Sequence, residues 1–66
     1  MTIIEAKHRG QWRAWAQAVD DIEAQRIAYR DTRAHPGQWL RFRDHSGDVR
    51  RIRYSIETDT HEVKGG

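Results

Sequence analysis

Residues 38–57 read QWLRFRDHSGDVRRIRYSIE, and this stretch decides the fold because apolar and polar side chains alternate along it. Alternation on both sides of a Ser-Gly pair predicts an antiparallel β-hairpin over residues 39–56. Arginines occupy one face of this hairpin. Its other face holds the apolar residues, which are Leu40, Phe42, Ile52, Tyr54 and Ile56.

The register of this hairpin depends on its turn. A two-residue turn at Ser46-Gly47, continued without a break, would place Phe42 opposite Arg51 and mix the two faces. Either a β-bulge at residues 50–51 or a longer loop over 45–49 restores the phase. Both alternatives pair Phe42 with Ile52 on the apolar face.

Upstream, residues 11–31 have helical periodicity. Apolar residues recur in steps of three and four and alanines lie between them, a pattern typical of an amphipathic helix. We therefore expect one long helix over 11–31, a linker over 32–38 that contains Pro36 and Gly37, and the hairpin beyond it. The expected core unites the hairpin's apolar face with Trp12, Trp15, Val19, Ile22 and Tyr29.

The two ends of the chain allow more than one interpretation. Thr2 and Glu5 have capping-box spacing, which favours a helix from Ile3 with a weak point at Gly10. The alternative is a short edge strand or loose arm before Gly10. The tail over 57–66 begins with a turn and allows a short third strand at 61–63. The sequence thus predicts a single small α+β domain over 1–66, a long helix packed on a hairpin.

Composition limits the classes of function. The 66 residues include no cysteine, which excludes disulfides and thiol chemistry and fits a reducing compartment. No stretch approaches the roughly 20 apolar residues of a membrane span, so we expect a soluble, cytoplasmic protein with no membrane contact. The net charge is +2, and the excess of arginine falls within residues 32–56.

The arginine face is the candidate partner-binding site. Guanidinium groups beside an aromatic ring suit carboxylates, phosphates and stacked bases alike. The alternative is a solvated face that protects a strand edge from aggregation. The expected site residues are Trp39, Arg41, Arg43, Arg50, Arg51 and Arg53.

Catalytic, metal and cofactor sites are not expected. His8, His35, His45 and His61 lie in separate segments without metal-ligand spacing. No glycine-rich phosphate loop and no nucleophile motif occurs, and adjacent carboxylates on a helix point about 100° apart. The sequence therefore predicts a protein that is not an enzyme.

Two functions follow from the arginine face. The first is a non-catalytic interaction protein, an adaptor or inhibitor, that presents this face and Trp39 to an acidic protein surface. The alternative is a nucleic-acid-binding protein that uses the same face on DNA or RNA. The three-four spacing over 12–29 is also a heptad seam, which suggests a homodimer through the helix.

Overall fold

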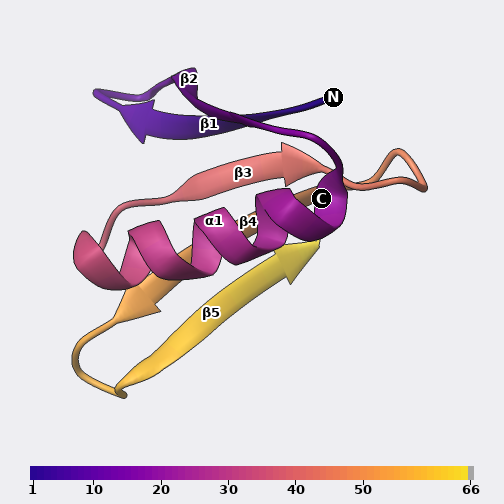
Figure 1. Cartoon of the computed structure of the whole chain (residues 1–66). Helices are drawn as coiled ribbons and strands as arrows, with labels where there is room; N and C mark the ends of the chain where they lie inside the picture. Colours follow the sequence, from indigo (N-terminus) through magenta and orange to yellow (C-terminus); the bar gives the residue numbers. More distant parts are fainter. Residues whose placement is uncertain (66) are drawn as a thin grey trace.

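The computed structural model describes residues 1–65 and contains one helix and one five-stranded antiparallel sheet (Figure 1). The strand order is β2-β1-β3-β4-β5, and the helix lies across one face of the sheet. The fold is therefore α+β, but the expected helix on a hairpin is wrong. The elements are β1 Thr2–His8, β2 Gln11–Ala18, α1 Asp21–Ala34, β3 Leu40–Arg43, β4 Val49–Ser55 and β5 Thr60–Gly65.

The largest correction concerns the segment that precedes α1. Strands β1 and β2 form a hairpin whose two-residue turn, Arg9-Gly10, has φ angles of 51° and 80°. Two consecutive positive φ angles match the right-handed twist of a tight hairpin, and glycine adopts one of them at no steric cost. Pairing with β1 therefore overrides the helix propensity of the alanines over 11–18. Strand β1 is an interior strand, so the expected helix from Ile3 is wrong, and so is the alternative of an edge strand or loose arm.

Strand β2 has a β-bulge at Trp15, the second of its two tryptophans. Ile4 pairs with Ala16 but Glu5 pairs with Ala14, so Trp15 is the extra residue. The Trp15 indole lies on the helix side, where its Nε1–H donates to the Asp31 carboxylate at 2.8 Å. Trp12 lies on the opposite side of the sheet. The three-residue spacing of Trp12 and Trp15 is therefore not a helical stripe, and neither residue is in the buried core. The heptad seam loses its basis for the same reason.

Helix α1 begins ten residues later than expected, at a variant of the capping box in which Glu23 reaches back to Val19, the residue before the N-cap Asp20. The Asp20 carboxylate accepts from the Glu23 backbone N–H at 2.8 Å, and the Glu23 carboxylate accepts from the Val19 N–H at 3.4 Å. Such reciprocal caps satisfy backbone donors at a helix start. Within residues 1–65, no helix is long and apolar enough to cross a membrane.

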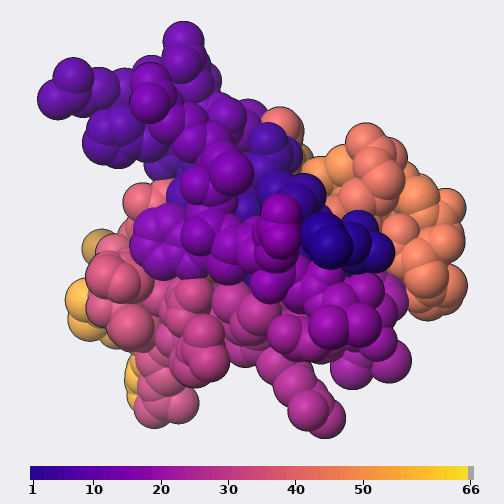
Figure 2. All heavy atoms as spheres, turned by 45° about the horizontal axis from the view of Figure 1, so that its top comes forward, coloured from indigo at the N-terminus to yellow at the C-terminus, as the bar shows by residue number. Residues whose placement is uncertain are grey.

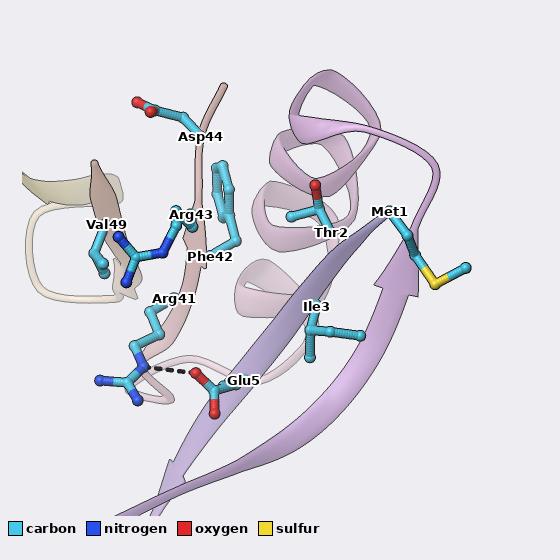
Figure 3. Close-up of a pocket in the computed structure, with 9 residues that line it drawn as sticks. All are labelled: Met1, Thr2, Ile3, Glu5, Arg41, Phe42, Arg43, Asp44 and Val49. Atoms are coloured by element: carbon cyan, nitrogen blue, oxygen red, sulfur yellow. Dashed lines mark hydrogen bonds and ion pairs between the residues drawn. The ribbon is translucent and has the colours of Figure 1, made fainter. Parts of the chain in front are cut away.

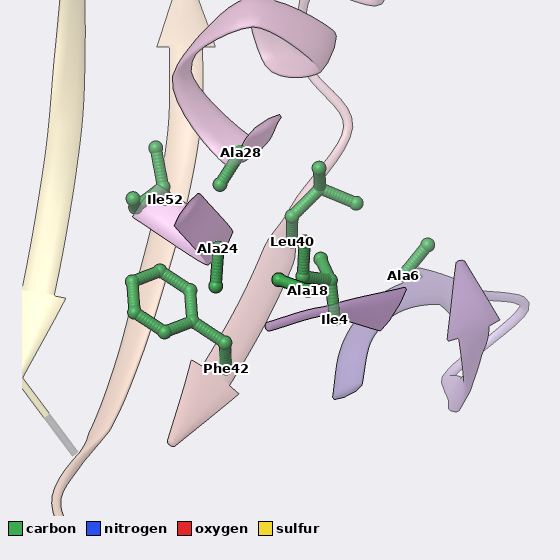
Figure 4. Close-up of a cluster of buried hydrophobic side chains, with 8 residues drawn as sticks. All are labelled: Ile4, Ala6, Ala18, Ala24, Ala28, Leu40, Phe42 and Ile52. Carbon is green, nitrogen blue, oxygen red and sulfur yellow. The ribbon is translucent and has the colours of Figure 1, made fainter. Parts of the chain in front are cut away.

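The core lies between α1 and the sheet (Figure 4). The helix presents small residues, Ala24, Ala28 and Thr32, so its backbone approaches the strands closely. Of the ten expected core residues, only Leu40, Phe42 and Ile52 belong to the buried hydrophobic cluster. Val19, Ile22 and Ile56 are 75%, 65% and 72% exposed. The cluster consists of Ile4, Ala6, Ala18, Ala24, Ala28, Leu40, Phe42 and Ile52.

Strands β3, β4 and β5 form a meander with a different register from the one expected. Phe42 pairs with Arg50 and Leu40 with Ile52, a shift of two residues. A shift of two leaves every side chain on its expected face, because the side-chain period of a strand is also two. Strand β5 pairs with β4 over its whole length, so the tail completes the sheet.

Candidate binding face

Among residues 1–65 no helix lies on one face of the sheet, and we call this face the open face. Side chains alternate between the two faces along each strand. Residues whose contacts show on which face they lie therefore also place their neighbours in the same strand. Cations outnumber acids on this surface. Its charged and aromatic residues are Glu5, Lys7, Trp12, Trp39, Arg41, Arg43, Arg51, Arg53, Glu62 and Lys64.

The structure brings together most of the expected site residues. Trp39, Arg41, Arg43, Arg51 and Arg53 all belong to the open face. Arg50 does not, because it pairs with Phe42 on the helix side and its Nε donates to the Asp44 carboxylate at 3.0 Å.

Sequence reasoning missed three contributors to the open face, namely Lys7, Trp12 and Lys64. Trp12 was assigned to a helical core, and Lys64 to the end of the tail. The alternation of Ile4 and Ala6 with Glu5 and Lys7 ahead of an Arg-Gly turn was the signal for the first hairpin. That hairpin places Lys7 and Trp12 on the open face.

Cations cover the indole rings of both open-face tryptophans. The Arg41 Cζ lies 4.3 Å from the ring centroid of Trp12. The Arg53 Cζ and the Lys64 Nζ lie 4.7 Å and 5.4 Å from that of Trp39. Such cation–π contacts contribute about 0.5–1 kcal/mol each at exposed sites and fix the orientation of the guanidinium planes.

Two ion pairs also fix the positions of these two arginines. Arg41 Nε donates to Glu5 at 2.9 Å, and Arg53 Nη2 donates to Glu62 at 2.7 Å. In the described part of the chain, the Arg53 Nε is buried and has no hydrogen-bond partner. Each guanidinium is thus held by a carboxylate and by a ring face, while about a third of each side chain stays exposed.

Three open-face cations, Arg41, Arg51 and Lys64, lie in a row across the sheet. Arg51 pairs with Arg41 on one side and with Lys64 on the other. Among residues 1–65, Arg51 makes no ion pair, and Arg43 donates to the backbone carbonyl of Gly47. Directly opposed like charges destabilise a sheet, so this row raises the free energy of the unliganded fold.

Strands β1 and β3 separate at one end and leave a hollow of about 440 Å³ (Figure 3). Their register contains the pairs Glu5–Arg41 and Ala6–Leu40. Strand β1 extends back to Thr2 and β3 forward to Arg43 on opposite sides of the hollow, and we call this space the β1–β3 fork. It is lined by Met1, Thr2, Ile3, Glu5, Arg41, Phe42, Arg43, Asp44 and Val49.

The loop between β3 and β4 is built around Asp44, whose side chain is 5% exposed. Its carboxylate accepts from the backbone N–H groups of Ser46 and Asp48 at 2.9 and 3.0 Å, and from the Ser46 hydroxyl. The hydrogen bond from Ser46, followed by that from Arg50, holds the pKa of Asp44 well below its ordinary value. This acid is therefore part of the loop scaffold and leaves the positive charge of the open face uncompensated.

His45 joins the same loop to the start of α1. Its Nδ1 and its backbone N–H both lie against the Asp21 carboxylate, at 2.8 and 3.2 Å. The side-chain hydrogen bond lowers the pKa of Asp21 and raises the pKa of His45. The loop is thereby held against the helix, on the side away from the open face.

The open face offers non-covalent recognition. Within residues 1–65, no three His, Cys, Asp or Glu side chains gather closely enough to hold a metal ion. The face supplies instead oriented guanidinium donors, two half-buried indoles and a hollow at one end of the sheet. Comparison of the chain with protein-family models, curated proteins and solved structures gives no match.

Proposed function

We propose that this chain is a small, non-catalytic protein-binding module whose open face recognises an acidic polypeptide segment. The observation that carries the proposal is the gathering of the open-face cations and both tryptophans on the one sheet surface that lacks a helix. Arginine and tryptophan are the residues most enriched among the dominant contacts of protein interfaces. The row Arg41, Arg51 and Lys64 gains stability when a partner supplies carboxylates.

Three features favour a polypeptide over a nucleic acid as the partner. The cations on Trp12 and Trp39 already occupy ring surface that bases would need for stacking. Glu5 and Glu62 lie among the arginines and would repel a continuous phosphate backbone. Ile3 and Val49 add apolar surface beside Arg43, which suits mixed acidic and apolar side chains.

The experiment compares the binding of two probes of similar length to the whole chain. One is an acetylated, C-terminally amidated decapeptide of alternating glutamate and valine, and the other is single-stranded oligodeoxythymidine. Amide chemical shifts from NMR titration report the affinity and the surface. We expect saturable binding of the peptide, with shift changes confined to the open face.

Matched double variants test whether the peptide binds at the open face. Arg43→Ser with Arg51→Ser removes two cations that have no ion pair with a face acid, and we expect peptide binding to fall at least about tenfold. The control, Arg13→Ser with Arg26→Ser, removes the same charge from exposed positions off the open face. Equal losses in the two double variants would contradict the proposal.

The oligonucleotide is the second arm of the test. Tight binding of oligodeoxythymidine whose affinity falls steeply with salt would replace the proposed function with nucleic-acid binding, since bound phosphates release counterions. A peptide that fails to bind at millimolar concentration would also overturn the proposal.

A further inference from the structure

The β1–β3 fork presents strand backbone to an incoming chain. The Lys7 N–H donates to the Trp39 carbonyl at 3.1 Å. Because alternate residues of a strand direct their backbone groups to the same neighbour, Ile3 and Arg43 direct theirs toward each other across the fork. Neither residue takes part in the β1–β3 pairing. An extended segment that enters here therefore meets backbone groups of both strands that do not pair across the fork.

The fork is closed at its inner end. The Glu5–Arg41 pair joins the two strands there, and the ion pair between the same side chains lies across the closure (Figure 3). An extended chain that enters from the mouth cannot continue between the two strands beyond this pair, which favours a chain that ends inside the fork. The volume of about 440 Å³ is near the lower limit for ligand sites and suits a few residues.

The positive charge in the fork favours the carboxyl terminus of a partner chain over its amino terminus. The Arg41 guanidinium uses its Nε for Glu5, so its terminal amino groups lie outside that hydrogen bond. Arg43, with its exposed side chain, is the second cation of the fork. Both acids that line the fork are already paired, Glu5 with Arg41 and Asp44 with Arg50. A carboxylate gains charge-assisted hydrogen bonds here, whereas an ammonium group would face two guanidinium groups.

Apolar side chains line part of the mouth of the fork. Met1 and Ile3 are 89% and 41% exposed, and Val19, 75% exposed, lies with Met1 around an adjoining hollow of about 230 Å³. In the space-filling view the first residues, in indigo, lie beside the orange loop between β3 and β4 (Figure 2). Residues that precede the terminal carboxylate can therefore place apolar side chains on this surface.

From these observations we infer that the β1–β3 fork binds the free carboxyl terminus of an extended partner polypeptide. The terminus would run parallel to β1 and antiparallel to β3, with its carboxylate at Arg41 and Arg43. This inference rests on the proposed function and specifies which part of the acidic partner occupies which part of the open face.

The test uses two forms of the acetylated glutamate–valine decapeptide, one with a free C-terminal carboxylate and one amidated. We expect the free form to bind about tenfold more tightly, because the amide replaces charge-assisted hydrogen bonds to the guanidinium groups with weaker neutral ones. The additional chemical-shift changes should appear at the backbone amides of Ile3 and Arg43.

A pair of single variants locates the effect. Arg43→Ser should reduce the preference for the free carboxylate, whereas Arg13→Ser removes the same charge from an exposed position off the open face and should leave that preference unchanged. Equal affinities of the wild-type chain for the two peptides would overturn the carboxyl-terminus inference, as would equal effects of the two variants. The amidated peptide alone decides the proposed function, so the two ideas can fail separately.

Discussion

At the scale of single residues, Asp44 shows how one side chain can decide a hairpin's register. The sequence identifies a turn over 45–49 but not the carboxylate that organises it. Because Asp44 accepts hydrogen bonds from Ser46, Asp48 and Arg50, the loop closes over residues 44–48 and Arg43 pairs with Val49. Asp44 alternates in phase with Phe42, and only its loop partners distinguish it from an ordinary polar residue at a strand end.

Replacement of Asp44 should therefore destabilise the whole sheet. In Asp44→Ala the loop donors lose their shared acceptor. Asp44→Asn keeps one acceptor oxygen for these donors, but it loses the charge and the oxygen that accepts from Arg50. We expect the urea midpoint to fall most in Asp44→Ala, less in Asp44→Asn, and least in the exposed neighbour Asp48→Ala. Equal midpoints for Asp44→Ala and Asp48→Ala would show that the carboxylate does not hold the loop.

The His45–Asp21 contact predicts a dependence of stability on pH. Because its pKa is raised by folding, His45 contributes stability that is complete below its ordinary pKa of 6.5 and is lost as the pH rises through the raised value. Asp21, with its pKa lowered, contributes above its ordinary value of 3.8 and loses this contribution as the pH falls through the lowered value. The pair should stabilise the fold most between about pH 4 and about pH 6.5.

Urea unfolding of the wild-type chain and His45→Ala at several pH values measures this contribution. The difference between their midpoints should be largest near about pH 5.5 and should shrink by about pH 9. The contact is exposed, so the difference will be small at every pH. In an Asp21→Ala background the pH dependence of the His45→Ala effect should disappear. Its persistence there would assign the effect to another partner of His45.

At the scale of elements, the sequence predicts the second hairpin well and the first half of the chain poorly. Residues 39–56 alternate clearly, and the two faces follow from alternation whatever the register. Residues 11–18 contain alanine and two tryptophans three apart, a pattern that suits a helix. The strand forms because the Arg9-Gly10 turn supplies a partner, and the bulge at Trp15 breaks the alternation that would have revealed it.

The small residues on α1 explain how one short helix closes the core. Ala24 and Ala28 are 0% exposed against the sheet, so the helix backbone lies close to the strands. Ala28→Leu should overpack this contact and lower the free energy of unfolding by about 1–3 kcal/mol. Gln25→Leu places the same side chain on the exposed side of α1 and should change it by less than about 0.5 kcal/mol. Similar denaturation curves for the two variants would refute close packing at Ala28.

At the scale of the whole molecule, the two faces of the sheet have opposite roles. The helix covers one face and encloses the core, while the other face keeps its cations and indoles half-exposed. Of the six residues that the sequence assigns to the arginine face, five lie on the open face, because alternation along a strand determines the side of each residue. The sequence pattern does not place Lys7, Trp12 and Lys64 on that face, because their position beside the arginines depends on the strand order β2-β1-β3-β4-β5. Strand order depends on non-local pairing, which local patterns do not encode.

The row of cations on the open face leads to the last prediction. Arg51 pairs with Arg41 and with Lys64, so Arg51→Glu exchanges two repulsive cross-strand contacts for two attractive ones. We expect the variant to be more stable than the wild-type chain, by roughly 0.2–1 kcal/mol for each cross-strand pair, and to bind the acidic peptide less tightly. Urea unfolding at low and high salt measures the first effect, and the gain should diminish at high salt because ions screen exposed charges. A variant that is less stable at low salt would show that the cation row does not strain the sheet, and would remove the energetic argument for an acidic partner.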